Sequence, residues 1–241
     1  MTKTVLLTKD KHKEICINTI YSQATGDSVM SFPTFALEFR NLQPHYPILF
    51  QKEAETGRFF PVVLLGLEQG ENLFLKADKW DCTYIPVMAQ KGPFSIGLYG
   101  EGDLKDKQRL IHIDADHPKV NNSIGLRLFE GHGGATEYLE KVSGLLDLIH
   151  HYNEHNQAFL KELIAKDLLE SVTIDITLAN GTKGQLFGYY TIKEERMLEL
   201  TGAELNSLNQ EGFLLPIYMA IASVSNVRKL IDRKSNESLN I

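Results

Sequence analysis

The chain has 241 residues, with 25 Lys and Arg against 31 Asp and Glu, and therefore a formal net charge of −6. Nucleic-acid binding depends on clustered cations that neutralise phosphates, so bases scattered among a larger number of acids argue against that function. With 43% hydrophobic and 23% charged residues, the composition is that of a globular protein that buries a core. Two cysteines, Cys16 and Cys82, are too few for a disulfide framework and fit a reducing compartment.

Neither a secretory signal nor a membrane span is expected. The apolar run near the amino terminus, residues 5–7, is too short for a signal-peptide core. The longest apolar stretch, residues 213–224, contains Pro216 and is shorter than the roughly 20 residues that cross a bilayer. We therefore expect a cytoplasmic protein.

The first half of the chain has the pattern of strands and ordered turns. From about residue 15 to residue 129, Gly and Pro recur, and the apolar runs are short and rich in aromatic and β-branched side chains. The best strand predictions are residues 46–50, 61–67 and 109–113.

The period changes at Ala135. Apolar residues then recur on one side at 100° per residue, which predicts one long amphipathic helix or two in sequence. Residues 172–192 alternate on either side of Asn180-Gly181 and predict a β-hairpin. One helix is expected at 194–200 and another near 216–231. Between them, Thr201 and Glu204 have the spacing of a capping box, which predicts that a helix begins after Thr201.

These elements predict an α+β fold with a β-rich N-terminal half and a helical C-terminal half that contains one β-hairpin. No linker composition separates the halves, so residues 1–241 are expected to form a single domain. The alternative is a division near residues 131–134, into a β-rich part, 1–130, and a helical part, 135–234, that holds the hairpin.

The cluster from His112 to His117 is a candidate metal site. On a strand, His112 and Asp114 point to the same face and could supply two adjacent ligands, as in iron(II) oxygenases with a facial triad. The third ligand would come from His132 or His151, and the cofactor would be Fe(II). The competing interpretation is that Asp116-His117-Pro118 forms the turn that ends the strand, with no cofactor involved.

Two further motifs have simple explanations. The histidines His150, His151 and His155 have spacing acceptable for zinc, but they lie nearly opposite the apolar stripe and are expected to face solvent. The segment 131–134 precedes a helix but lacks the Lys-Ser/Thr pair of a phosphate-binding loop, so it is predicted to be a flexible joint.

Residues 59–74, which read FFPVVLLGLEQGENLF, are distinctive as a whole. The matching pieces around them span nearly the whole chain: Tyr46-Pro47-Ile48, Trp80, Tyr84-Ile85-Pro86, Gly92-Pro93-Phe94, Leu128-Phe129-Glu130, Phe159-Leu160, residues 184–190 and residues 208–212. In this combination the chain resembles the SapC family of bacterial proteins.

The resemblance implies a cytosolic protein without a signal peptide, from a family named after a bacterial surface-layer locus. Relatives tend to accompany genes for flavin-dependent tryptophan halogenase-like enzymes, cupin-like proteins and outer-membrane uptake receptors. The resemblance carries over no catalytic residues. The family usually has basic and aromatic residues, of the Arg-Arg-Tyr kind, directly before a Pro-Phe pair. This chain has Gln90-Lys91-Gly92 before Pro93-Phe94. The expected absence of membrane spans separates this family from the peptide-transport permease of the same name.

Within the matched region, Asn72, Trp80 and Tyr84 are the candidate ligand-binding residues. Trp and Tyr can floor a pocket and offer a hydrogen bond, and an Asn among apolar neighbours must find partners for its amide. The competing interpretation is that Asn72 locks a turn and the two aromatic rings belong to the core.

Two functions from different classes follow. The first is a non-enzymatic binding or accessory protein that recognises a small molecule, a peptide or a partner protein and supports a surface-layer, uptake or modification system. The alternative is an iron(II)-dependent, oxygenase-like enzyme that uses His112 and Asp114. A structural role in an assembled surface layer is a third and weaker hypothesis.

Overall fold

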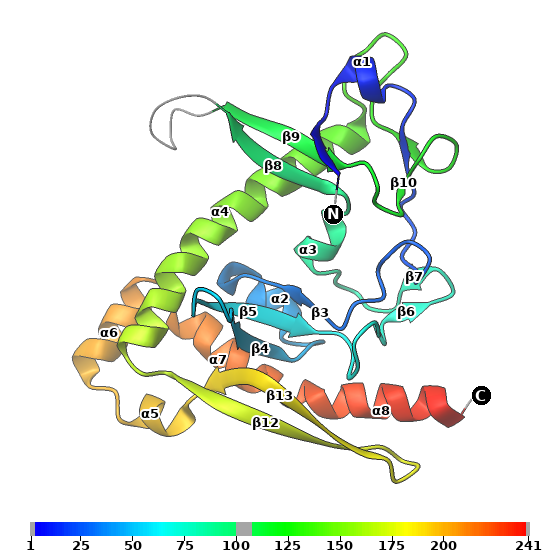
Figure 1. Cartoon of the computed structure of the whole chain (residues 1–241). Coiled ribbons are helices and arrows are strands. Elements are labelled where there is room, and N and C mark those ends of the chain that lie inside the picture. Colours follow the sequence, from blue (N-terminus) through cyan, green and yellow to red (C-terminus); the bar gives the residue numbers. More distant parts are fainter. Residues whose placement is uncertain (1–2, 100–107, 240–241) are drawn as a thin grey trace. The chain divides into compact units, whose positions relative to one another are not determined.

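The computed structural model of the chain (Figure 1) describes residues 3–99 and 108–239. It confirms an α+β fold, with strands dominating the first half and helices the second. The chain folds into two compact units, each assembled from separated segments. Unit 1 comprises Met1–Asp27, Leu75–Asp81 and Val87–His150, and unit 2 comprises Ser28–Phe74, Cys82–Pro86 and His151–Ile241.

Unit 1 contains two three-stranded antiparallel sheets. The first sheet has the order β1 (Thr4–Leu6), β9 (Gln108–Asp114) and β8 (Phe94–Tyr99), and it includes the strand predicted at 109–113. The second has the order β10 (Val120–Asn121), β2 (Cys16–Ile17) and β11 (Leu126–Arg127). The same unit holds the hairpin of β6 (Leu75–Lys76) and β7 (Lys79–Trp80), and the short helices α1 (Lys9–His12) and α3 (Val87–Gln90).

The core of unit 1 forms where the first turns of α4 (Glu137–Ala165) pack on strand residues. Leu139, Val142 and Leu146 recur at helical spacing and are buried. They meet the buried side chains Ile17, Phe94, Ile113 and Leu128. Burial of each large aliphatic side chain stabilises the fold by about 1.5–3 kcal/mol. The amphipathic pattern predicted from Ala135 is therefore confirmed as one long helix.

Unit 2 is built on a five-stranded antiparallel sheet. Its order is β12 (Leu169–Thr177), β13 (Lys183–Ile192), β4 (Ile48–Lys52), β5 (Phe59–Leu64) and β3 (Ser31–Pro33). The hairpin predicted at 172–192 and the strands predicted at 46–50 and 61–67 are thus confirmed. β13 pairs with β4 only through Tyr189 and Tyr190, so the tip of the hairpin extends beyond its neighbours (Figure 1).

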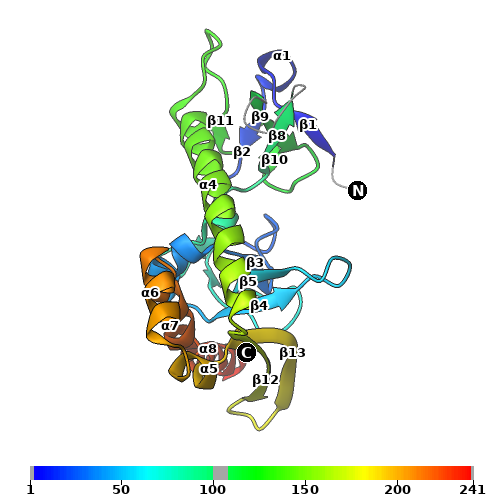
Figure 2. The same ribbon diagram turned by 90° about the vertical axis from the view of Figure 1, so that its left-hand side faces the viewer.

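Helices cover this sheet and complete its core. They are η1 (Ala36–Glu38), α2 (Phe39–Leu42), α5 (Glu194–Leu198), α6 (Gly202–Gln210), α7 (Leu214–Ser223) and α8 (Asn226–Leu239). Figure 2 shows α6 and α7 beside the C-terminal part of α4. There Phe159 of α4 packs edge-on against Phe39 and Phe213, at centroid distances of 6.0 and 5.6 Å.

The single helix predicted near 216–231 is wrong in one respect, because the structure has two helices, α7 and α8, that meet at Val224 and Ser225. Buried polar side chains explain the break. The hydroxyl oxygen of Ser223 accepts a hydrogen bond from the backbone N–H of Ile48 at 2.9 Å. Asn226, only 2% exposed, donates to the carbonyl oxygens of Gln43 and Tyr46. These contacts redirect the chain between the helices.

One helical segment among the described residues, Leu214–Asn236, is long and apolar enough to cross a membrane. In this fold 44% of its most apolar window is buried. Ile217, Ala220 and Leu230 on the segment are at most 2% exposed and belong to the core. A core helix meets the same length and composition criteria, so the absence of a membrane span stays a prediction.

Candidate functional site

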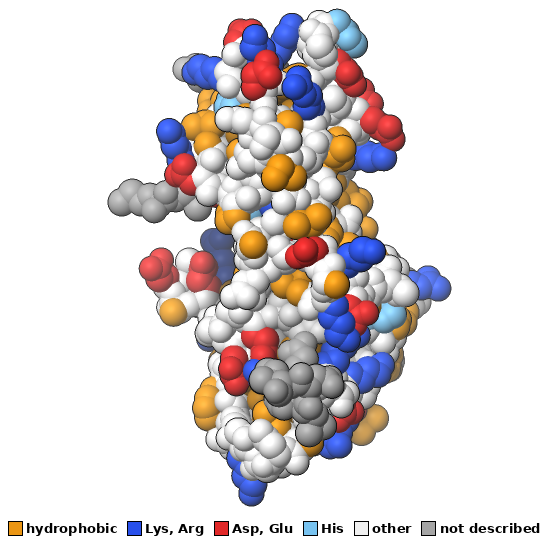
Figure 3. All heavy atoms as spheres, turned by 90° about the vertical axis from the view of Figure 1, so that its right-hand side faces the viewer, with side chains coloured by type: hydrophobic (Ala, Val, Ile, Leu, Met, Phe, Trp, Pro, Cys, Tyr) orange, Lys and Arg blue, Asp and Glu red, His pale blue; other side chains and the backbone are white. Residues whose placement is uncertain are grey.

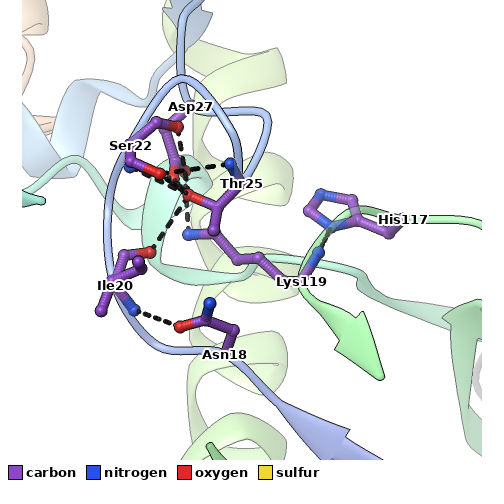
Figure 4. A network of polar contacts seen from close by, with 7 residues as sticks. All are labelled: Asn18, Ile20, Ser22, Thr25, Asp27, His117 and Lys119. Atoms are coloured by element: carbon purple, nitrogen blue, oxygen red, sulfur yellow. Dashed lines mark hydrogen bonds and ion pairs between the residues drawn. The ribbon is translucent and has the colours of Figure 1, made fainter. Parts of the chain in front are cut away.

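Strand pairing in unit 1 brings two distant segments together. β2 and β10 pair with Ile17 opposite Val120, and the ladder continues where the N–H of Asn18 donates to the carbonyl oxygen of Lys119 at 2.8 Å. The chain after β2, residues 18–27, therefore lies against the chain before β10. This pairing places the polar side chains of both segments in one cluster (Figure 4).

At the centre of the cluster is a buried ion pair. The Lys119 ammonium lies 2.8 Å from Oδ1 of Asp27, and the two side chains are 5% and 6% exposed. The other carboxylate oxygen of Asp27 accepts hydrogen bonds from the Thr25 hydroxyl at 2.7 Å and from the backbone N–H of Ser22 at 3.1 Å. Charges that are removed from water in this way need both a counter-charge and hydrogen bonds, and here they have them.

Aromatic rings form a second layer around the lysine. The Lys119 ammonium lies 4.1 Å from the centroid of the Tyr21 ring, within the range of a cation–π contact. Tyr21 in turn packs edge-on against Trp80 of β7 at 5.5 Å. Lys119 and its two aromatic supports are thereby held on three different segments of unit 1.

Next to this cluster lies a pocket of about 490 Å³. One wall is a face of α4, and the other walls come from residues 18–21, residues 90–93 and Lys119. The helix residues that line it recur at helical spacing and are Tyr138, Lys141, Val142, Gly144, Leu145 and Leu148. Ligand pockets in proteins commonly span about 300–1,000 Å³, so this one is large enough for a small molecule.

The pocket lining combines an apolar body with hydrogen-bond donors. Burial, and then the charge of Asp27, raise the pKa of Tyr21 to about 12, and burial with the neighbouring Tyr21 raises the pKa of Tyr138 to about 12. A phenol is protonated at neutral pH even at its ordinary pKa of about 10, so both hydroxyls can donate a hydrogen bond. Among the described residues the lining includes two lysines, Lys119 and Lys141, and no Asp or Glu.

Comparison with known proteins adds the family. A model of the SapC family matches residues 7–230. The chain belongs to the SapC family. No curated protein and no solved structure matches it. The resemblance carried by residues 59–74 and the pieces around them is thereby confirmed.

The structure places the three predicted ligand-binding residues of this SapC chain in different units. Asn72 and Tyr84 belong to unit 2 and Trp80 to unit 1. Asn72 is 7% exposed, and its side-chain oxygen accepts the N–H of Phe74 at 3.0 Å, as a turn-locking residue does. Trp80 does not line the pocket, but it supports Tyr21, which does.

Tyr84 takes part in a buried polar cluster of unit 2. Its hydroxyl donates to Oε1 of Glu38 at 3.1 Å, and its carbonyl oxygen accepts the Tyr46 hydroxyl at 2.5 Å. The other Glu38 oxygen accepts the Thr34 hydroxyl at 2.7 Å. Burial, and then the Glu38 carboxylate, raise the pKa of Tyr84. These contacts tie η1 to the segment that carries Tyr84.

His112 and Asp114 lie on β9 on the face opposite the core residue Ile113, as the alternation predicts. The His112 ring stacks on Tyr99 at 5.6 Å, with Nε2 3.2 Å from its hydroxyl, and packs so closely on Gly97 that a Cβ there would lie 2.2 Å from Cε1. No three His, Cys, Asp or Glu side chains gather as a metal site requires in the parts of the chain that the structure describes. Neither His132 nor His151 joins His112 and Asp114 as a third ligand in this structure. The iron(II) site therefore stays a prediction.

The other histidine cluster differs from its expected position. His151 is exposed, but His150 and His155 are half-buried, and His155 packs edge-on against Phe213 at 5.3 Å. The prediction that all three histidines face solvent is therefore wrong for His150 and His155. His155 is covered because Phe159 lies four residues later on the same face of α4.

The glycine-rich segment 131–134 is an ordered turn rather than a flexible joint. The N–H of Glu130 donates to the carbonyl of Gly134, and that of Gly133 donates back to Glu130, each at 2.8 Å. Gly133 has a φ of +96°, a conformation that glycine adopts readily. The segment lies inside unit 1 and does not separate the two units.

The sequence does not reveal the polar residues that line the pocket of this SapC chain, Tyr21, Lys119, Tyr138 and Lys141, or the supporting Asp27. Asp27 and Lys119 are far apart in the sequence, and only the pairing of β2 with β10 joins them. The usable signal was Gly144, which interrupts the apolar face of a long predicted helix and leaves room beside it.

Proposed function

We propose that this SapC-family chain is a binding protein that holds a small molecule in the α4 pocket of unit 1. The observation that carries the proposal is the pocket itself, about 490 Å³ in volume, with an apolar wall and several polar groups directed by buried contacts. Sites for small molecules have this character, since apolar surface provides affinity and a few fixed polar groups provide orientation.

The rigidity of the pocket supports the proposal. Lys119 is fixed by the Asp27 carboxylate and the Tyr21 ring, and Tyr138 packs against the buried Phe94 at 6.3 Å. Side chains that are already ordered lose little conformational entropy when a ligand binds. A pocket with fixed walls can therefore bind a small molecule without first reorganising.

We propose further that the protein acts as a cytoplasmic accessory of a surface-layer, uptake or modification system. This part rests on the family resemblance alone. Figure 3 shows basic and acidic side chains intermixed on the face that it displays, which agrees with a protein that does not bind nucleic acid.

Gly144→Leu tests the binding proposal. Gly144 lines the pocket and a Cβ there meets nothing within 4 Å, so we expect a leucine side chain to occupy part of the pocket. Replacing a helical glycine also stabilises α4 by about 0.5–1 kcal/mol. We expect ligand-observed NMR with a library of small organic fragments to detect binders of the wild-type chain that Gly144→Leu no longer binds.

Gly202→Leu is the matched control. Gly202 begins α6 in unit 2, and a Cβ there also meets nothing within 4 Å. This variant should bind the same fragments as the wild type. The proposal would be overturned if the fragments bound Gly144→Leu as well as the wild type. The fragments would then be binding somewhere other than the filled pocket.

A further inference from the structure

We infer that the ligand of the α4 pocket is an organic anion with an apolar body, such as a carboxylate attached to an aromatic or alkyl group. The inference rests on the proposed binding function and specifies its ligand class. It follows from the charge, the hydrogen-bonding capacity and the apolar surface of the residues that line the pocket.

The charged groups of the lining are both cationic. Lys119 and Lys141 line the pocket, whereas Asp27, the counter-charge of Lys119, is not part of the lining. Lys119 of the buried pair is thus part of the lining, whereas its partner Asp27 is bound by the Thr25 hydroxyl outside the lining. A lining with positive charges and, among the described residues, no negative charge attracts a negative group.

Lys141 is the cation that can change partner. Its ammonium lies 2.8 Å from Glu137 one turn earlier on α4, and the two side chains are 73% and 82% exposed. Exposed pairs of this kind contribute little to stability, so a ligand carboxylate can replace Glu137 at small cost. Lys119 is fixed and Lys141 is adaptable.

The neutral polar side chains of the lining, Asn18, Thr19, Tyr21, Gln90 and Tyr138, can each donate a hydrogen bond. The side-chain oxygen of Asn18 already accepts the N–H of Ile20 at 3.1 Å, so its NH₂ group is the one left to face a ligand. The Tyr21 and Tyr138 hydroxyls are protonated at neutral pH, as a phenol is even at its ordinary pKa of about 10, and can donate to a ligand. A set of donors is complementary to an acceptor-only group, and a carboxylate is such a group.

The remaining lining requires an apolar body. Val142, Leu145 and Leu148 form a continuous stripe on α4, and Pro93 faces them from the segment after α3. A small inorganic anion would leave this surface in contact with water, whereas an aromatic or alkyl group would cover it. Charge and shape together select an amphiphilic anion.

The test is isothermal titration calorimetry of the full chain with 4-phenylbutyrate and its neutral isostere 4-phenylbutanamide. Loss of a charge-assisted hydrogen bond is expected to weaken binding of the amide about tenfold relative to the acid. Inorganic phosphate, which has the charge without the apolar body, should bind at least about tenfold more weakly than the acid.

Two variants assign the preference to Lys141. Lys141→Met should reduce the preference for the acid over the amide, since only Lys119 then remains as a cation of the lining, while Glu137→Gln, which frees Lys141, should leave the acid bound as tightly as before or more tightly. Both positions are exposed, so the fold is retained. If the heat of probe binding disappears in Gly144→Leu, the probes bind in this pocket.

The outcomes are distinguishable. If acid and amide bind equally and Gly144→Leu abolishes both, the anion inference is overturned and the binding function stands. If phosphate binds as well as the acid, the apolar part of the inference is overturned. If neither organic probe binds the wild-type chain at millimolar concentration, the anion inference is overturned, and the fragment screen with Gly144→Leu decides the binding function separately.

Discussion

Asp27 and Lys119 carry opposite charges on side chains that are almost entirely shielded from water. Their side chains are 6% and 5% exposed, and the carboxylate also holds Thr25 and Ser22. Such a pair is costly to break, because removal of one partner leaves the other charged and buried. At the residue scale this pair determines where the Lys119 ammonium stands and hence the polarity of the pocket.

Asp27→Asn should therefore lower the free energy of unfolding by about 3–5 kcal/mol. The measurement is urea denaturation followed by the fluorescence of Trp80, the one tryptophan of the chain, which lies in unit 1 against Tyr21. Glu137→Gln is the matched control, since it breaks a pair with the same N–O distance, 2.8 Å, between exposed side chains. The control should show no measurable change, and an equal loss in both variants would refute the structural role of the buried pair.

His117 should make stability depend on pH. Burial and then the Lys119 ammonium lower its pKa, with Lys91 acting in the same direction and Asp114 and Asp27 opposing. Below the unfolded pKa of about 6.5 the unfolded chain takes up more protons than the folded one, so the free energy of unfolding falls as the pH drops. His117→Gln should give a shallower slope in urea midpoints between pH 7.5 and pH 5.5. An unchanged slope would show that His117 does not contribute to the pH dependence of stability.

At the scale of elements, local sequence signals specify much of the fold. The alternation on either side of Asn180-Gly181 gives the hairpin β12–β13, and the apolar period after Ala135 gives α4, because each pattern depends only on neighbours in the chain. The break between α7 and α8 was missed because Ser223 and Asn226 satisfy backbone groups of a distant segment. Contacts of that kind leave no periodic trace in the sequence.

The capping box of α6 provides a prediction at this scale. The Thr201 hydroxyl accepts the N–H of Glu204 at 3.3 Å, and the Glu204 carboxylate accepts the N–H of Thr201 at 2.8 Å, as the spacing predicts. Thr201→Ala should cost about 1 kcal/mol of unfolding free energy in urea denaturation. Asn209→Ala, an exposed position of the same helix, keeps the cap and is the control. A loss of equal size in both variants would show that the cap adds nothing.

At the scale of the whole molecule, the chain crosses between two units several times. Unit 1 takes residues 75–81 from the middle of the chain and so acquires Trp80, while residues 82–86 with Tyr84 belong to unit 2. The sequence predicted either one domain or a division near residues 131–134. Interleaved segments have no linker to mark them, so neither the two units nor a pocket built from residues 18–21, 90–93 and α4 could be read from composition.

The most direct test of the binding pocket is chemical-shift mapping on the full ¹⁵N-labelled chain, titrated with 4-phenylbutyrate. If the probe occupies the pocket, the largest amide shifts will fall on Thr19, Tyr21, Gly92, Gly144 and Leu145, and Gly144→Leu will abolish them. Shifts concentrated in unit 2, or shifts that persist in Gly144→Leu, would contradict a ligand site on α4 of unit 1.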